Sequence, residues 1–289
     1  MNLAAEISSV SKFYGSFRLQ DVNLAVPAGN ILGLIGQNGA GKTTLFKCIL
    51  NLIGRDSGSV RMPGIGQDIS SEKIRGLVGY VPERLAFYEW MTVDAALRFT
   101  SKFYPNWDAG RCRDLMSRYE LDSGKKIKEL SMGMRKKLGL LQALAIQPRL
   151  LILDEPTSGL DPVMKFYFLQ DLRHVIDTGA TGAVMISSHN LDEVERLVDS
   201  IAILKLGVLR CHEPKRRFLE AWHKVEFTPP AEVDWVREFE NTAHPIAANR
   251  AMFVTREETG YLTRKLALLG AGAIEVSRPN LQEIFLQVA

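Results

Sequence analysis

Cysteine and long apolar runs are both scarce in this sequence. Its 289 residues include three cysteines, Cys48, Cys112 and Cys211, which are widely separated and form no metal-ligand pattern. This usage argues against a disulfide-stabilised scaffold or a zinc site. The longest apolar run, 138–146, contains Gln142 and is far shorter than the roughly 20 residues that a membrane-spanning helix needs. The sequence therefore indicates a reduced, cytoplasmic protein with no direct membrane insertion.

A strong charge bias is also missing. The 36 Lys and Arg residues against 33 Asp and Glu give a net charge of +3, which by itself does not indicate nucleic-acid binding. The N-terminus carries Glu6 and lacks a basic flank before an apolar core, so no signal peptide is expected. A hydrophobic content of 46% is typical of globular chains. At about 150 residues per domain, the length predicts two domains.

What the sequence does contain is an alternation of strand and helix patterns. Short apolar runs typical of buried parallel strands occur at 31–35, 79–81, 150–153, 183–186 and 201–204. Helical stretches lie between them, and one is predicted to begin at Asp161 and Pro162 and to stop at Gly179. This alternation predicts an α/β fold around a parallel sheet.

Two regions depart from the alternation. Residues 92–104, 108–120 and 131–146 predict helices with no strand candidate between them, which indicates an all-α insertion. Residues 212–217 form a polar, basic break. Beyond the break, strands are predicted at 251–254 and 273–276 around a helix at 259–269, and a capping box of Asn280 and Glu283 predicts a final helix. The C-terminal part is therefore expected to be a small α/β appendage.

A glycine-rich loop fits the pattern G-x-x-x-x-G-K-[ST] between a predicted strand and a predicted helix. Its residues are Gly36, Gln37, Asn38, Gly39, Ala40, Gly41, Lys42 and Thr43, with Thr44 following. Glycine lets backbone N–H groups approach phosphates, and the helix N-terminus adds positive charge there. Lys42 is predicted to bind the β- and γ-phosphates of ATP, and the Thr43 hydroxyl to bind Mg²⁺.

Two adjacent carboxylates follow the apolar run at 150–153. Asp154 is expected at the C-terminal end of a buried strand, where ligands of α/β sheets bind, and is predicted to share the Mg²⁺ ion with Thr43. Glu155 is then placed to polarise a water molecule. An acidic turn alone is common, but together with the phosphate-binding loop it predicts nucleotide hydrolysis.

Further short motifs occur in a fixed order between about residues 5 and 207. Leu130-Ser131-Met132-Gly133-Met134 resembles the LSGGQ signature of ATP-binding cassette (ABC) ATPases. Ser158–Asp161 resembles the D-loop of that family, and His189 its switch histidine. Tyr14 lies where the family stacks an aromatic ring on adenine. Each motif is weak alone, but the ordered set resembles the ABC family specifically.

The resemblance implies a fold and a domain division. The expected fold is a P-loop NTPase core with an antiparallel β subdomain, an all-α signature subdomain at about 88–146, and a small C-terminal α/β appendage. Residues 1–210 would form the nucleotide-binding domain and 211–289 the accessory domain.

The resemblance also implies site roles. Lys42, Glu155 and His189 would be catalytic, and Ser131, Gly133 and Asp161 would bind nucleotide, the signature residues serving the ATP of a second subunit. Where the family's Q-loop has glutamine, this chain has Glu83, which would join Thr43 and Asp154 around the metal.

The single loop and single signature imply a second ATPase subunit, either a copy of this chain or a paralogue. A separate transmembrane permease is the other expected partner, and aromatic residues at 87–91 either contact it or pack into the helical insertion. Through the permease the protein would lie on the inner face of the cell membrane. The C-terminal segment 279–288 resembles subunits of bacterial exporters.

The alternative function is a soluble ABC-type ATPase acting on nucleic acid or ribosomes. Members of the ABC family that act on DNA carry long coiled coils, and members that act on ribosomes carry two cassettes in one chain. Neither feature occurs here. A small-molecule P-loop kinase would leave Ser131, Gly133 and the segment 158–161 unexplained.

Overall fold

The computed structural model describes residues 2–62, 66–67, 71–179, 181–229, 244–247 and 250–288. The chain divides into two compact units. The first comprises Met1–Asn190 and Arg196–His212, and the second comprises Leu191–Glu195 and Glu213–Ala289. Within the described residues, no helix combines the length and hydropathy that crossing a bilayer would require.

The centre of the first unit is a parallel sheet whose strands are almost entirely buried. In the described chain the strand order is β5-β4-β1-β2-β10-β9-β3-β8-β7-β6. The parallel strands are β3 (Ile31–Ile35), β6 (Val78–Val81), β7 (Leu150–Asp154), β8 (Val184–Ser188) and β9 (Ser200–Lys205). Because β3, β7 and β8 are buried on both faces, they consist of apolar runs, followed in β7 by Asp154 and in β8 by Ser187 and Ser188. The predicted parallel sheet is confirmed, with strand ends shifted by one or two residues.

An antiparallel part continues the same sheet. It contains β1 (Leu3–Tyr14), β2 (Phe17–Pro27), β4 (Ser57–Met62) and β5 (Gly66–Gln67). Strands β1 and β2 form a hairpin in which Tyr14 pairs with Phe17, and Gly15 provides the left-handed turn at φ 49°. The hairpin thus places two aromatic rings at its tip. Strand β10 (Val208–Pro214) pairs with β2.

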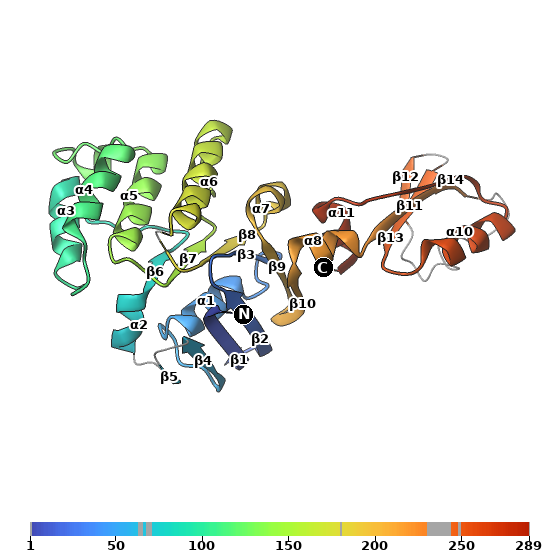
Figure 1. Cartoon of the computed structure of the whole chain (residues 1–289), viewed down its shortest axis with the longest axis horizontal. Helices are drawn as coiled ribbons and strands as arrows, with labels where there is room; N and C mark the ends of the chain where they lie inside the picture. Colours follow the sequence, from blue (N-terminus) through green and yellow to red (C-terminus); the bar gives the residue numbers. More distant parts are fainter. Residues whose placement is uncertain are drawn as a thin grey trace. The chain divides into compact units, whose positions relative to one another are not determined.

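The predicted helical insertion is confirmed. It contains α3 (Val93–Ser101), α4 (Ala109–Arg118) and α5 (Met132–Leu144), which Figure 1 shows gathered as one group of helices in green. Side-chain oxygens of Thr92, Asp108 and Ser131 accept amide hydrogen bonds at the respective N-termini. Helices α1 (Lys42–Ile49), α2 (Ser71–Leu77) and α6 (Pro162–Asp177) complete the unit, and α6 begins after the predicted cap Asp161.

The second unit is built on an antiparallel sheet in the order β12-β13-β11-β14. Its strands are β11 (His223–Thr228), β12 (His244–Ala247), β13 (Arg250–Thr255) and β14 (Gly272–Ser277). Helix α10 (Thr259–Leu268) packs Leu262 and Leu266 against Phe227 and Phe253. The predicted capping box starts α11 (Leu281–Val288), with reciprocal 2.8 Å bonds between Asn280 and Glu283. Residues 230–243 and 248–249, within the predicted appendage, lie outside the described residues.

The predicted break at 212–217 is wrong in its local structure. Glu213 and Pro214 end β10, and the basic residues form the first turn of α8 (Lys215–Glu220). Pro214 precedes the helix, and Arg216 forms an ion pair with Glu220 one turn later. A charge run at the start of an amphipathic helix therefore has the same sequence pattern as a solvated linker. Helix α7 (Leu191–Leu197) contributes residues to both units.

Candidate nucleotide site

The glycine-rich loop connects β3 to α1 under tight steric limits. A Cβ atom placed on Gly36 would collide with the carbonyl oxygen of Leu204 in β9. Gly41 adopts a left-handed conformation at φ 106°, and a Cβ there would lie 2.8 Å from Phe17 Cζ. Glycine is therefore required at both positions, and the loop can bring its N–H groups together at the start of α1.

Lys42, the first residue of α1, lies at the centre of the loop. The residue is only 6% exposed. Its Nζ donates to the Gly36 carbonyl oxygen at 2.6 Å and lies 3.3 Å from Glu155 Oε1. A buried ammonium of this kind needs anionic or carbonyl partners to offset the loss of hydration. The loop and Glu155 provide them and fix the cation where phosphate would bind.

Asp154 and Thr43 form a compact oxygen cluster. Thr43 Oγ1 donates to Asp154 Oδ2 at 2.7 Å, and Ser187 Oγ donates to Asp154 Oδ1 at 2.6 Å. Asp154 is 1% exposed, so its carboxylate is held in one orientation. A hydroxyl and a carboxylate oxygen are ligands that Mg²⁺ prefers. The donor set therefore fits the predicted metal.

Glu155 has an unusual backbone and two basic neighbours. Its φ is +46°, a left-handed conformation that costs a non-glycine residue about 1–2 kcal/mol. Oε1 faces Lys42, and Oε2 lies 2.8 Å from His189 Nδ1. Ser187 Oγ accepts the Glu155 amide at 2.8 Å. The strained turn thus directs this carboxylate into the site between a lysine and a histidine.

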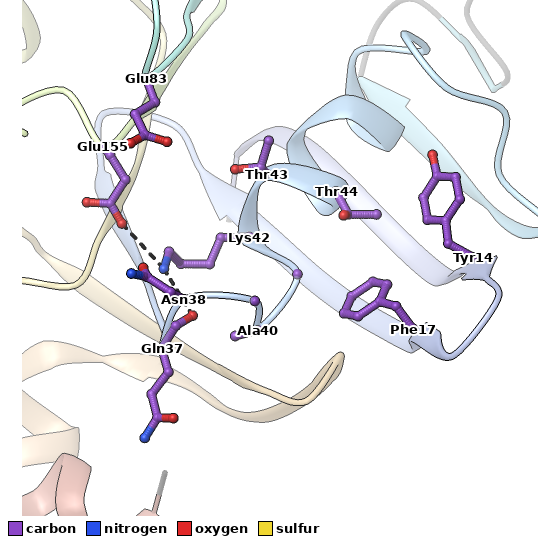
Figure 2. A pocket seen from close by; sticks show the side chains of 12 residues that line it. Tyr14, Phe17, Gln37, Asn38, Ala40, Lys42, Thr43, Thr44, Glu83 and Glu155 are labelled. Atoms are coloured by element: carbon purple, nitrogen blue, oxygen red, sulfur yellow. Dashed lines mark hydrogen bonds and ion pairs between the residues drawn. The ribbon is translucent and has the colours of Figure 1, made fainter.

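Lys42, Thr43 and Glu155 border an open pocket of about 540 Å³, shown in Figure 2. The pocket is lined by Tyr14, Phe17, Gln37, Asn38, Gly39, Ala40, Gly41, Lys42, Thr43, Thr44, Glu83 and Glu155. In Figure 2, Glu83 and Glu155 lie on one side and the rings of Tyr14 and Phe17 on the other. Lys42 lies between them. One end can therefore bind phosphate and metal, and the other can stack on a planar base.

The structure does not bring every predicted site residue to this pocket. The predicted residues that are not among its lining residues are Gly36, Ser131, Gly133, Asp154, Asp161 and His189. Asp154 and His189 contact it indirectly, through Thr43 and Glu155 respectively. Ser131 Oγ accepts the Met134 amide at 3.2 Å, and Asp161 accepts amides at the start of α6. A Cβ on Gly133 would lie 2.6 Å from Met164 Cε, so the signature packs tightly against α6.

Three residues of the site were not predicted. Phe17 was missed because the hairpin that carries it has no clear strand pattern. Ser187 bridges Asp154 and Glu155 from the neighbouring strand β8, and a serine at a strand end gives no specific signal. Lys136 donates from α5 to the Glu155 carbonyl oxygen at 3.1 Å.

Comparisons with known proteins agree with this geometry. A family profile described as ABC transporter matches residues 19–158, and one described as AAA domain, putative AbiEii toxin, Type IV TA system, matches residues 124–195. The ABC transporter ATP-binding protein YtrB of Bacillus subtilis (strain 168) is 35% identical over 201 residues, which are 69% of this chain and 68% of that protein. The bacitracin transport ATP-binding protein BcrA of Bacillus licheniformis is 33% identical over 215 residues, 72% of this chain and 69% of that protein.

A similar fold is also found among solved structures. One described as the ATP binding subunit of an ABC transporter matches with a TM-score of 0.66 and 29% sequence identity. The match covers 74% of this chain and 93% of that chain. The P-loop core, the antiparallel strands and the helical insertion are thus the parts of an ABC cassette. The chain belongs to the ATP-binding proteins of ABC transporters and is an ATPase of that family.

Proposed function

We propose that this chain powers export of a substrate through a permease that is a separate polypeptide. Residues 1–210 would form the nucleotide-binding domain and 211–289 an accessory domain. The observation that carries the hydrolytic part is the contact of Glu155 with both Lys42 and His189 beside the phosphate-binding loop. Export is supported by the resemblance of the C-terminal segment 279–288 to exporter subunits.

The side chains divide the proposed reaction between them. Lys42 and the loop N–H groups would hold the β- and γ-phosphates of ATP. Thr43, Asp154 and Glu83 would hold Mg²⁺, which when bound neutralises charge on the phosphate oxygens. Tyr14 would stack on the adenine.

Glu155 and His189 would carry out the hydrolytic step. Glu155 would take the proton of the attacking water, and His189, at 2.8 Å, would keep that carboxylate directed toward it. The water oxygen then bonds to the γ-phosphorus as ADP leaves.

An exposed group of aromatic side chains is the proposed permease contact. Tyr88 and Trp90 are 56% and 69% exposed, and their ring centroids lie 6.0 Å apart. Tyr88 also packs edge-on against Phe99 of α3, and Phe99 against Phe103. The group begins five residues after Glu83, which lines the pocket. A partner bound there would contact a segment that closely follows the pocket residue Glu83 in the chain.

The proposal predicts that the chain is recovered from cell membranes with a polytopic protein. Affinity purification in mild detergent should give this complex, and Tyr88→Ala with Trp90→Ala should lower its yield at least about tenfold, as expected for hot-spot aromatics. Tyr261→Ala, which removes an equally exposed ring from the second unit, is the matched control. Recovery with ribosomes or nucleic acid and without a membrane protein would support the soluble alternative instead. The compact helical insertion of the described residues gives that alternative no support.

A second prediction concerns assembly. Because Ser131 and Gly133 lie outside the pocket of their own chain, we expect ATP to join two chains so that each signature covers the other chain's Lys42. Light scattering of Glu155→Gln should show a doubling of mass with Mg-ATP, and Ser131→Arg should prevent it. The same variant without nucleotide is the control. A monomer at high protein and ATP concentrations would argue against a homodimer and for a paralogous partner.

A further inference from the structure

A buried lysine connects the signature helix to the backbone of Glu155. Lys136 belongs to α5 and is 3% exposed. Its Nζ donates to the Glu155 carbonyl oxygen at 3.1 Å. Lysine is almost never this buried without compensating partners, because removal of an ammonium from water costs several kcal/mol. The position of Lys136 therefore needs an explanation beyond helix packing.

The surroundings of Lys136 are acidic. Burial lowers its pKa, and the nearby carboxylates of Glu83, Glu155 and Asp154 oppose that decrease, Glu83 most strongly. Glu83 and Glu155 also line the same pocket. Three carboxylates that surround the nucleotide site thus act on one buried cation.

The contact of Lys136 is made where the backbone is strained. Glu155 adopts φ +46°, and its carbonyl oxygen accepts hydrogen bonds from Ser158 N at 3.1 Å and from Lys136 Nζ. The direction of the Glu155 side chain depends on this backbone conformation. Loss of one donor would let the turn relax and move the carboxylate away from Lys42 and His189.

We propose that Lys136 is a positioning residue, which fixes the Glu155 backbone from the signature helix. The inference rests on the proposed role of Glu155 in activating water. Ser131 caps the same helix five residues before Lys136. A single rigid element therefore carries both the signature and a donor to the hydrolytic residue. A movement of α5 would therefore be transmitted directly to the Glu155 backbone.

The first test is steady-state ATP hydrolysis by Lys136→Met and Lys136→Gln. Misplacement of a reacting group by about 1 Å can cost on the order of 100-fold, so we expect kcat to fall at least about tenfold. The KM for ATP should change less than about threefold, because Lys136 does not line the pocket. Lys137→Met is the matched control, since Lys137 follows on the same helix and its Nζ lies over the Tyr119 ring at 5.8 Å. It should keep wild-type kcat.

The second test separates charge balance from packing. The Glu155 contact is lost whether residue 83 is Glu or Gln, so adding Lys136→Gln in a Glu83→Gln background should still lower kcat at least about tenfold. The two substitutions together make a neutral amide pair. A loss of less than about threefold in that background would mean that Lys136 acts only by balancing the charge of Glu83, which overturns the positioning role, and wild-type kcat in both Lys136 variants would overturn it as well.

Folding and the role of Glu155 are checked in parallel. Thermal unfolding and binding of a fluorescent ATP analogue give the folded fraction of each variant. A kcat that falls only in proportion to that fraction would mean that Lys136 serves stability alone, which overturns the proposal. If Lys136→Met does not fold, Lys136→Gln decides. Glu155→Gln distinguishes the two hypotheses: its full activity would refute the role of Glu155, whereas its inactivity beside active Lys136 variants would refute only the inference.

Discussion

Replacement of Glu155 by Gln is expected to lower ATP hydrolysis by about 100-fold or more while ATP still binds. The amide keeps the size of the side chain but cannot accept the proton of the attacking water, and loss of a general base costs about 10²–10⁴ in rate. Binding should persist, because the phosphate contacts come from the loop and Lys42. Removal of the negative charge 3.3 Å from Lys42 Nζ should also favour bound phosphate.

The measurement is phosphate release together with equilibrium binding of ATP to the same preparation. Glu257→Gln, a substitution of an exposed glutamate in the second unit, is the matched control and should leave both values unchanged. Turnover of Glu155→Gln within about threefold of the control, far above the loss expected for a general base, would remove Glu155 from the hydrolytic role.

Lys42→Ala is expected to lower ATP affinity by about 100-fold or more. Hydrogen bonds to charged groups contribute about 1.5–3 kcal/mol each, and two phosphate contacts of this size correspond to at least two factors of ten. The variant should also unfold at a lower temperature, because Glu155 would lose the ammonium 3.3 Å from Oε1 inside a largely buried site.

Isothermal titration with Mg-ATP and a thermal melt test both effects. Lys47→Ala is the control, since Lys47 is exposed on the same helix α1. Unchanged affinity in Lys42→Ala would mean that the pocket binds its ligand without this ammonium. An unchanged melting temperature would mean that water replaces the partner of Glu155.

The sequence predicted the parallel core better than the antiparallel strands, for a physical reason. The buried strand β3 is apolar at every position, and β7 is apolar up to its last residue, Asp154, which is a strong local signal. Strand β1 pairs with β2 through several register irregularities, among them one between Ile7 and Val10. Each such bulge breaks the alternation of buried and exposed residues by which a half-buried strand is predicted.

The site residues also differ in how well the sequence alone predicts them. The phosphate-binding loop was predictable because its requirements are local: glycines at the turn and a lysine at the helix start. Lys136 was not, because it lies in the basic run 135–137, which has the pattern of a solvated helix face. Its contact with Glu155 joins residues 19 positions apart, and that of Ser187 with Asp154 joins residues 33 apart. Such contacts depend on tertiary packing.

The position of β3 between β8 and β9 also bears on how the protein is made. The strand that leads into the phosphate-binding loop pairs with Val184–Ser188 on one side and with β9 on the other. The Ile31 amide donates to Asp199, 168 positions later in the chain. At about 5–20 residues per second of synthesis, β3 emerges from the ribosome on the order of ten seconds before its last neighbour. Until β8 and then β9 are translated, this wholly apolar strand has one or both edges open, so the danger of aggregation is greatest in the nascent chain before β9 is translated.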